Sequence, residues 1–467
     1  MSYLLRYIIF SLKDYMKVSL SRLAFARTFV LILLSGFLFS LSSCSDDSYL
    51  NAIPRESTAV VALNLEKSGC TSCPSLLQSL LHVNSLEKSG LDFDSRAYIF
   101  TAPDGSLGFC ARLESQSDWK DFLSRSAGKR QTVWLADRRG CSFAAVANWV
   151  MGWNDHTLLA MGPVTPAAQA ELQAQMARYL NQDEEEGFSA SRMYARLDSI
   201  EAPMAMVAQV KALPQKFSAP FMLGAPKDAD ASQVVLAAGI ENKEGILLFR
   251  CNTFSFNPRV DEALTKAREV YRPIKGTFVP QLHRKALFSW FVNVDGSQFL
   301  PLLQSDAGLQ AMLAGINAAI DMDNILRSVD GDLTITIPSF SDNDVQLSML
   351  AQLAHTRWTA DIDYWKKSVP KGSSLFDSGT NQWCYQNGGS KFYFGFTPDK
   401  QFFSGTDLSA ARPSAARPNP MLQRFVSGKR MVMILDLSAP ASQKAMNAAG
   451  TMLEPLFGKV KEIVFQF

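Results

Sequence analysis

The chain has 467 residues, of which 47% are hydrophobic and 19% are charged. This composition is typical of a folded chain with a large core, and it excludes disorder throughout, a collagen-like rod and a coiled-coil rod. There are 46 basic and 44 acidic residues, so a net charge of +2 predicts no basic surface for nucleic acid. At roughly 150 residues per domain, the length predicts about three domains' worth of chain.

Residues 1–43 are predicted to be a signal peptide. A basic start that includes Lys17, Arg22 and Arg27 leads into the apolar run Thr28–Leu41. As a helix this run would span about 21 Å, which is short of the roughly 30 Å hydrocarbon core of a bilayer. A signal-peptide core therefore fits the run better than a permanent membrane span.

A lipid-attachment site is predicted at Cys44, where Leu41-Ser-Ser-Cys44 resembles the lipobox of bacterial lipoproteins. Residues 44–50 would then form a lipidated tether, because two or three acyl chains on one cysteine anchor a protein stably. The acidic Ser45-Asp-Asp47 is similar to the surface-export signal of Bacteroides-group lipoproteins. We expect an outer-membrane lipoprotein that faces the periplasm or, slightly favoured, the cell surface.

The remaining sequence alternates predicted strands and helices. Strands that lead into helices are predicted at Thr58–Leu65, Ala202–Val210, Lys285–Val294 and Arg430–Leu437. Helices follow at Ser75–Leu81, after Pro214, at Gln298–Leu303 and at Ala441–Met446. Three of these strand–helix pairs precede a predicted strand hairpin, with turns at 103–105, 241–244 and 341–344.

The first and third of these units are longer and share further elements. Each has a short helix, at 118–120 and 363–366, then a meander with turns at Arg139-Gly140 and Gly388-Gly389. We therefore predict an α+β fold of repeated β-α-β-β units with mixed or antiparallel, ferredoxin-like sheets. The two halves would be residues 51–272 and 284–467, related by internal duplication. Ordinary α+β alternation is the alternative.

Two linkers are predicted from composition. Residues 169–187 are helical and then acidic, and residues 412–420 are rich in proline, which cannot continue a helix or a central strand. Ligand contacts are expected between the halves, because clefts between domains are common binding sites.

The opening of the mature chain suggests a family. The lipobox, Asn51-Ala-Ile-Pro54 and the strand Thr58–Leu65 resemble the start of a Bacteroides-group lipoprotein family of unknown function. Members of that family have a similar length and alternate strands and helices. The resemblance implies no activity, cofactor or catalytic residue.

Cys70 and Cys73 form the sharpest local motif, Cys-Thr-Ser-Cys-Pro, between a predicted strand and helix. A thioredoxin-like redox pair occupies such a place, where the helix N-terminus lowers the pKa of the first thiol. However, Ser68-Gly69 precede the motif, where a redox pair usually has an aromatic residue. A local disulfide or two unpaired thiols is therefore the favoured interpretation.

Aromatic residues concentrate near residue 390. Trp383, Tyr385, Tyr393 and Phe402 are candidates for a surface patch that stacks on a glycan or contacts a protein. Because side chains alternate between the faces of a sheet, not all of them can enter one core. The alternative is that helices and neighbouring strands cover these rings.

No catalytic or cofactor motif stands out. The four histidines, at 82, 156, 283 and 355, are too far apart in sequence for a metal motif, and no nucleotide-binding loop is present. We expect no metal and no cofactor. The predicted function is a non-enzymatic binding or assembly component that meets the membrane through its lipid and an unknown protein or glycan ligand. An envelope enzyme with a dispersed site, or a thiol-redox protein that uses Cys70 and Cys73, is the alternative.

Overall fold

The computed structural model describes residues 47–65, 78, 85–126, 132–213, 215–284, 286–306, 309, 310, 313, 317, 320–337, 347–417, 419–438 and 459–467. Two compact units divide the chain, residues 1–48 and residues 49–467, and the fold below is that of the second unit. Among the described residues, no helix combines the length and the apolar character that a bilayer crossing requires.

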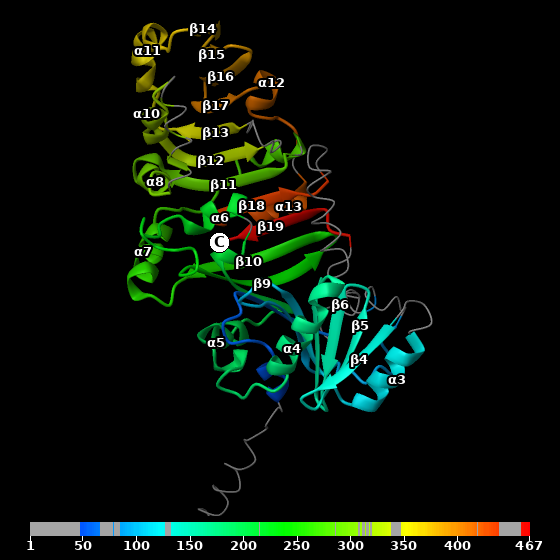
Figure 1. Ribbon diagram of the computed structural model, residues 1–467. Coiled ribbons are helices and arrows are strands. Elements are labelled where there is room, and N and C mark those ends of the chain that lie inside the picture. The colour runs from blue at the N-terminus through cyan, green and yellow to red at the C-terminus, as the bar shows by residue number, and fades with distance from the viewer. Residues whose placement is uncertain are drawn as a thin grey trace, which may run out of the picture. The chain divides into compact units, whose positions relative to one another are not determined.

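Nineteen described strands join in one sheet (Figure 1). The first ten are β1 (Ala59–Asn64), β2 (Arg96–Thr101), β3 (Leu107–Arg112), β4 (Thr132–Arg138), β5 (Cys141–Val146), β6 (Trp149–Trp153), β7 (Thr157–Gly162), β8 (Met204–Gln209), β9 (Val235–Lys243) and β10 (Ile246–Phe254). The others are β11 (Phe288–Asp295), β12 (Val329–Ile337), β13 (Ser348–Leu353), β14 (Ser373–Gly379), β15 (Gln382–Asn387), β16 (Ser390–Phe396), β17 (Gln401–Gly405), β18 (Met431–Asp436) and β19 (Glu462–Gln466).

Helices cover both faces of this sheet. The described α-helices are α3 (Gln116–Ser126), α4 (Gln169–Tyr179), α5 (Arg192–Asp198), α6 (Gln215–Met222), α7 (Pro258–Arg268), α8 (Gly296–Leu303), α10 (Met322–Arg327), α11 (Ile362–Ser368), α12 (Leu408–Ala411) and α13 (Pro420–Val426). Short 3-10 helices lie at η1 (Asp47–Ala52), η2 (Pro166–Ala168), η3 (Phe188–Ala190), η4 (Val210–Ala212), η5 (Val279–Arg284) and η6 (Arg357–Asp361).

The strands of the two halves pair in matching order. Along the sheet, the first half runs β4-β5-β6-β7-β3-β2-β1-β8-β9-β10. The second half runs β14-β15-β16-β17-β13-β12-β11-β18-β19. These pairs are antiparallel, and β10 then joins β19 in a parallel pair. The mixed fold class with a mostly antiparallel sheet is thereby confirmed.

The ferredoxin-like arrangement is not confirmed by the described strands. In a split β-α-β unit, the two strands that a helix joins are parallel, and a third strand lies between them. Here β1 lies between β2 and β8, and β11 lies between β12 and β18, all antiparallel. β2 therefore pairs directly with β1, with no strand between them.

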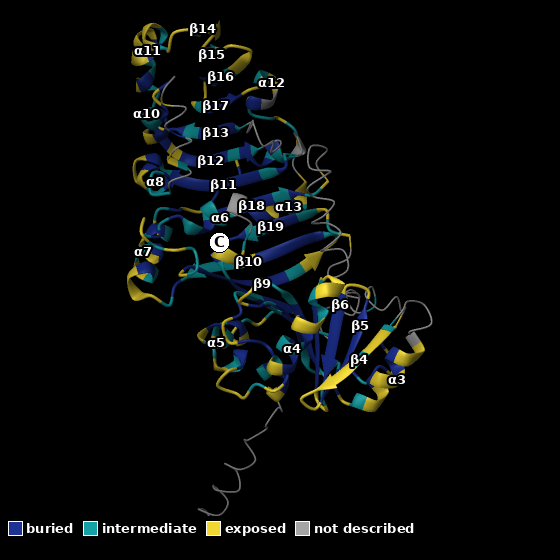
Figure 2. Cartoon of the chain, viewed as in Figure 1, coloured by how far each residue is buried: buried dark blue, intermediate teal, exposed yellow. Residues whose placement is uncertain are grey.

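Side chains on β11 show how the core is divided. Trp290 and Val292 point into one apolar cluster with Phe299 of α8. Phe291, between them, points into another cluster with Leu422 and Phe425 of α13. This alternation has the period of two that a strand imposes, and it buries both faces (Figure 2). A near-continuous apolar run such as β11 is typical of a strand that is covered on both sides.

The hairpin turns contain residues whose backbone angles fit the turn. Arg139 and Gly140, between β4 and β5, both have positive φ (52° and 78°), as a two-residue hairpin turn demands. The predicted hairpin at 103–105 is confirmed. The turn expected at 241–244 lies later, at Glu244-Gly245, because β9 continues to Lys243. The turn at 341–344 and the helices expected at 75–81 and 441–446 lie outside the described residues, apart from Gln78.

The predicted linkers also contain regular structure. Residues 169–179 form α4 as expected, and the acidic residues 183–186 are exposed. The proline-rich stretch, however, ends where Pro420 begins α13, because proline fits the first position of a helix and Asn419 caps it.

Candidate functional site

The predicted lipid-attachment and thiol sites fall outside the described part of the chain. These sites are Cys44, Cys70 and Cys73. Two other cysteines, Cys110 and Cys141, are free and buried in the structure.

The predicted aromatic patch is divided between the two faces of the sheet. Trp383 and Phe402 are 9% and 0% exposed and pack around Trp358, with ring centroids 5.8 and 6.1 Å from its ring. Tyr385 is half-buried, and its hydroxyl donates to Ser373 Oγ at 3.1 Å. Tyr393 pairs across the strands with buried Cys384, which places it on the opposite face. The four residues therefore form no common surface, and Trp383 and Phe402 belong to the core.

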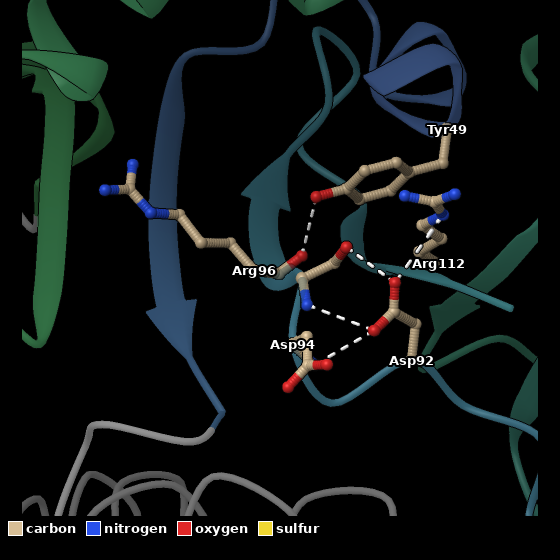
Figure 3. A network of polar contacts seen from close by, with 6 residues as sticks. Tyr49, Asp92, Asp94, Arg96 and Arg112 are labelled. Atoms are coloured by element: carbon tan, nitrogen blue, oxygen red, sulfur yellow. Dashed lines mark hydrogen bonds and ion pairs between the residues drawn. The ribbon is translucent and has the colours of Figure 1, made fainter. Parts of the chain in front are cut away.

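A polar network at the start of β2 has a structural role (Figure 3). Asp92 accepts hydrogen bonds from the backbone N–H of Asp94 and from the hydroxyl of Ser95, at 2.9 and 2.7 Å, and contacts Arg112 at 3.5 Å. The Tyr49 hydroxyl donates to the carbonyl oxygen of Arg96 at 2.8 Å. These bonds fix the turn before β2. Among the described residues, no cluster of three or more His, Cys, Asp or Glu could hold a metal ion.

The most distinctive cavity lies where the two halves meet. β10 pairs with β9 as far as Phe254, but it pairs with β19 only as far as Arg250, opposite Gln466. Residues 251–254 therefore continue past the end of β19. A cavity of about 350 Å³ opens beside them, which we call the junction cleft. It is lined by Pro220, Phe221, Leu223, Thr253, Leu264, Thr265, Ala267, Arg268, Glu269, Tyr271, Arg430, Met431 and Phe467.

The helix α7 supplies one wall of the junction cleft. Asn257 caps its N-terminus by accepting a hydrogen bond from the N–H of Arg259, and Pro258 occupies the first helical position. Val260 and Leu264 lie one turn apart and are buried against the sheet. This packing fixes the last turn of α7, which carries Arg268.

Tyr271 lies in the floor of the junction cleft with an unsatisfied hydroxyl. The residue is 6% exposed, and its hydroxyl has no hydrogen-bond partner among the described residues. Its ring packs edge-on against Phe299 at 5.9 Å. Burial raises the pKa of the phenol, so it stays neutral and can donate a hydrogen bond. A buried polar group without a partner costs free energy that a ligand can recover.

Two arginines of the junction cleft have no acidic partner. Arg268 donates to Asn252 Oδ1, Thr265 Oγ1 and the Leu264 carbonyl oxygen, at 2.7, 2.9 and 3.3 Å. Arg430 donates to the carbonyl oxygen of Arg268 at 3.4 Å. Within the described part of the chain, neither guanidinium lies within 4.0 Å of a carboxylate. Glu269, which is exposed, is the acidic side chain of the lining.

A second, shallower hollow lies beside the junction cleft and shares Phe467 with it. It has a volume of about 410 Å³ and includes Arg196, Arg250, Lys429 and Cys251. Arg250 forms an ion pair with Glu241, whose carboxyl pKa is lowered by hydrogen bonds from Arg250 and Lys243. Because no buried polar group of its lining lacks a hydrogen-bond partner among the described residues, this hollow is the weaker candidate for a ligand site.

Sequence analysis did not identify the residues of the junction cleft. The cap Asn257-Pro258 was an available signal for α7, and therefore for the position of Arg268. Tyr271 and Arg430 carry no local signal, because 158 positions separate them in the sequence. The expectation that a ligand site would lie between the halves remains a prediction, and the junction cleft is where it can be tested.

Comparison with solved structures finds distant likeness to TP0453. Crystal form IV of TP0453 is 8% identical, with a TM-score of 0.29 over 45% of this chain and 81% of that chain. Crystal form I of the same protein is 10% identical, with a TM-score of 0.20 over 77% of this chain and 91% of that chain. These scores do not establish a shared fold.

Sequence comparison gives a family. No curated protein matches the chain. Residues 75–416 match the family model described as Domain of unknown function (DUF4836), which covers most of the described sheet. The resemblance to a family without an assigned activity is confirmed at that level, and the chain belongs to the DUF4836 family.

Proposed function

We propose that this protein is a membrane-anchored envelope lipoprotein that binds a ligand or assembly partner without converting it, and that the junction cleft is its binding site. The observation that carries the proposal is the junction cleft itself, in which, among the described residues, a buried hydroxyl has no hydrogen-bond partner and two arginines have no acidic partner. A neutral phenol and two guanidinium groups are suited to holding a ligand. They are poor nucleophiles and poor general bases near neutral pH.

The strand order supports a duplicated architecture around this site. We infer that the two halves derive from one ancestral unit, with β1 to β9 corresponding in order to β11 to β19. The corresponding strands share the same neighbours, including the unusual pairs β3–β7 and β13–β17. α3 and α11 follow β3 and β13 at corresponding points of the chain. Such a duplication leaves a seam between two similar units, and clefts at seams are common binding sites.

Site-specific photocrosslinking tests the binding proposal. Thr265 is exposed on α7 and lines the junction cleft, whereas its neighbour Lys266 is exposed and does not line it. A benzophenone side chain placed at Thr265 in the full-length chain in living cells should give a discrete added mass. The same group at Lys266 should not. Identical adduct patterns from the two positions would exclude the junction cleft as the binding site.

The anchor is tested separately. The lipobox predicts that Cys44 carries acyl chains, so Cys44→Ala should abolish the incorporation of labelled palmitate and release the protein from the membrane fraction. Cys141→Ala, which removes a buried cysteine of the folded unit, is the matched control and should keep both. Equal labelling of wild type and Cys44→Ala would contradict lipidation at this residue.

A further inference from the structure

We propose that the ligand of the junction cleft is a single-chain carboxylate amphiphile, that is, a fatty acid. This inference rests on the proposed binding role of the junction cleft and adds the chemical class of its ligand. Three properties of the lining carry it: an apolar floor, a pair of unneutralised arginines, and a buried hydroxyl.

The floor of the junction cleft is apolar. Phe221, Leu264 and Met431 are 5%, 2% and 7% exposed and come from α6, α7 and β18. Leu223, Ala267 and Phe467 extend this apolar surface. An aliphatic chain that covers it gains free energy in proportion to the apolar area buried. The volume of about 350 Å³ is at the small end for ligand pockets, which favours one short chain over a lipid with two chains.

The arginines select an anionic head group. A guanidinium group has five N–H donors, of which Arg268 uses three and Arg430 uses one within the described residues. The remaining donors match the two oxygens of a carboxylate, and arginine pairs with carboxylates in this two-pronged way. Among the side chains of the lining, Arg268 and Arg430 are basic and Glu269 is acidic.

The hydroxyl of Tyr271 completes the site. The residue lines the junction cleft together with both arginines, and its hydroxyl, which is buried, has no partner among the described residues. A carboxylate oxygen held by the arginines can accept its hydrogen bond, which satisfies the one buried polar group that the cleft leaves unpaired. A neutral alkane would leave this group unsatisfied.

Calorimetric titration of the full anchored chain in nanodiscs tests the ligand class, with empty nanodiscs as the blank. Decanoate is the probe, 1-decanol has the same chain without the charge, and acetate has the charge without the chain. Decanoate should bind at least about tenfold more tightly than decanol, because a hydrogen bond to a charged group is worth at least that factor. Acetate should give no measurable heat at the same concentrations.

Variants locate the site. Arg430→Gln and Tyr271→Phe should each weaken decanoate binding by about tenfold, while Arg424→Gln, on the exposed side of α13 and outside the lining, should leave it unchanged. Tyr271→Phe removes a single oxygen atom, and an unchanged circular dichroism spectrum with an unchanged melting temperature shows that it folds.

Two results would overturn the inference: equal binding of decanoate and decanol, or unchanged decanoate binding in both Arg430→Gln and Tyr271→Phe. The photocrosslink at Thr265 separates this failure from failure of the proposed function. If the crosslink persists while decanoate does not bind, the junction cleft binds a ligand of another class. If both are absent, neither proposal stands.

Discussion

Buried polar residues of this protein divide into those that are fully satisfied and those that are not. Asp332 is 3% exposed and accepts hydrogen bonds from the backbone N–H groups of Lys275 and Thr277 and from Asn293, at 2.9, 2.8 and 2.9 Å. It ties the segment that connects the halves to β12. Tyr271 is also buried, but its hydroxyl has no partner among the described residues. A satisfied group of this kind stabilises the fold, whereas an unsatisfied one at a cavity is available to a ligand.

The role of Asp332 gives a stability prediction. Asp332→Ala leaves three donors without an acceptor, of which the amide of Asn293 is buried, so we expect the free energy of unfolding to fall by about 2 kcal/mol. Asp330→Ala is the control on the same strand. It removes a carboxylate whose ion pair with Arg272 is exposed, and it should cost less than about 1 kcal/mol. Urea unfolding measures both variants. Equal losses in the free energy of unfolding would contradict the stabilising role of the hydrogen bonds to Asp332.

The thiol of Cys110 gives a pH prediction. Burial raises its pKa in the folded state, so the folded chain keeps the thiol proton at pH values where the unfolded chain has released it. In the unfolded chain the thiol has a pKa of about 8.5. Below that pH this group makes its whole contribution to the free energy of unfolding, and the contribution is lost as the pH rises above it.

The slope of the free energy of unfolding against pH tests whether Cys110 makes stability fall as the pH rises. Above about pH 9, Cys110→Ala should lose stability less steeply than wild type, by up to about 1.4 kcal/mol per pH unit. Val150→Ala, a truncation in the same apolar cluster, should keep the wild-type slope although it lowers stability. A Cys110→Ala slope that equals the wild-type slope between pH 8 and 10 would contradict the prediction.

At the scale of elements, neighbouring strands are held in register by complementary sizes. Gly108 of β3 lies directly opposite Phe100 of β2, whose buried ring covers it. A Cβ atom at Gly108 would overlap the carbons of that ring. Glycine is needed here because of this close approach. The backbone conformation does not require it, because the φ of Gly108 is not in the left-handed region.

Replacing this glycine should loosen the β2–β3 pair. Gly108→Ala forces the Phe100 ring from its site, and we expect a loss of about 2 kcal/mol in the free energy of unfolding. Gly389→Ala, in a hairpin where an added Cβ meets nothing within 4 Å, should change stability by less than about 0.5 kcal/mol. Adding Phe100→Leu to Gly108→Ala should restore part of the loss. Failure of that rescue would mean that the strain has another origin.

Many elements were predictable because their signals are local. The strands that became β1, β8, β11 and β18 have apolar runs that end at polar or turn residues, and Arg139-Gly140 marks a hairpin by type. α7 was missed although Asn257-Pro258 marks its start. β19 is only five residues long, and its partner β10 is more than 200 positions earlier. Such a pairing leaves no trace in a single sequence, and the junction cleft depends on it.

At the scale of the whole unit, the halves share both a sheet and a core. β10 pairs with β19 through five residue pairs, from Ile246–Glu462 to Arg250–Gln466. One apolar cluster contains Phe221 and Leu264 from the first half and Trp290 and Met433 from the second. Since neither half can lose its structure without exposing part of this shared core, their unfolding is expected to be coupled.

Calorimetry tests this coupling. Wild type should unfold in one transition with equal calorimetric and van't Hoff enthalpies. Val464 is 0% exposed in β19 and packs with Ile246 and Leu248 of β10, so Val464→Asp places an unpaired carboxylate in the seam between the halves. This variant should separate the two halves into two transitions, because the seam weakens while the core of each half remains. Lys461→Asp, exposed just before the same strand, should keep one transition. Two transitions in wild type would show that the halves are independent domains, and the junction cleft would then be a mobile interface that cannot hold a ligand in a fixed geometry.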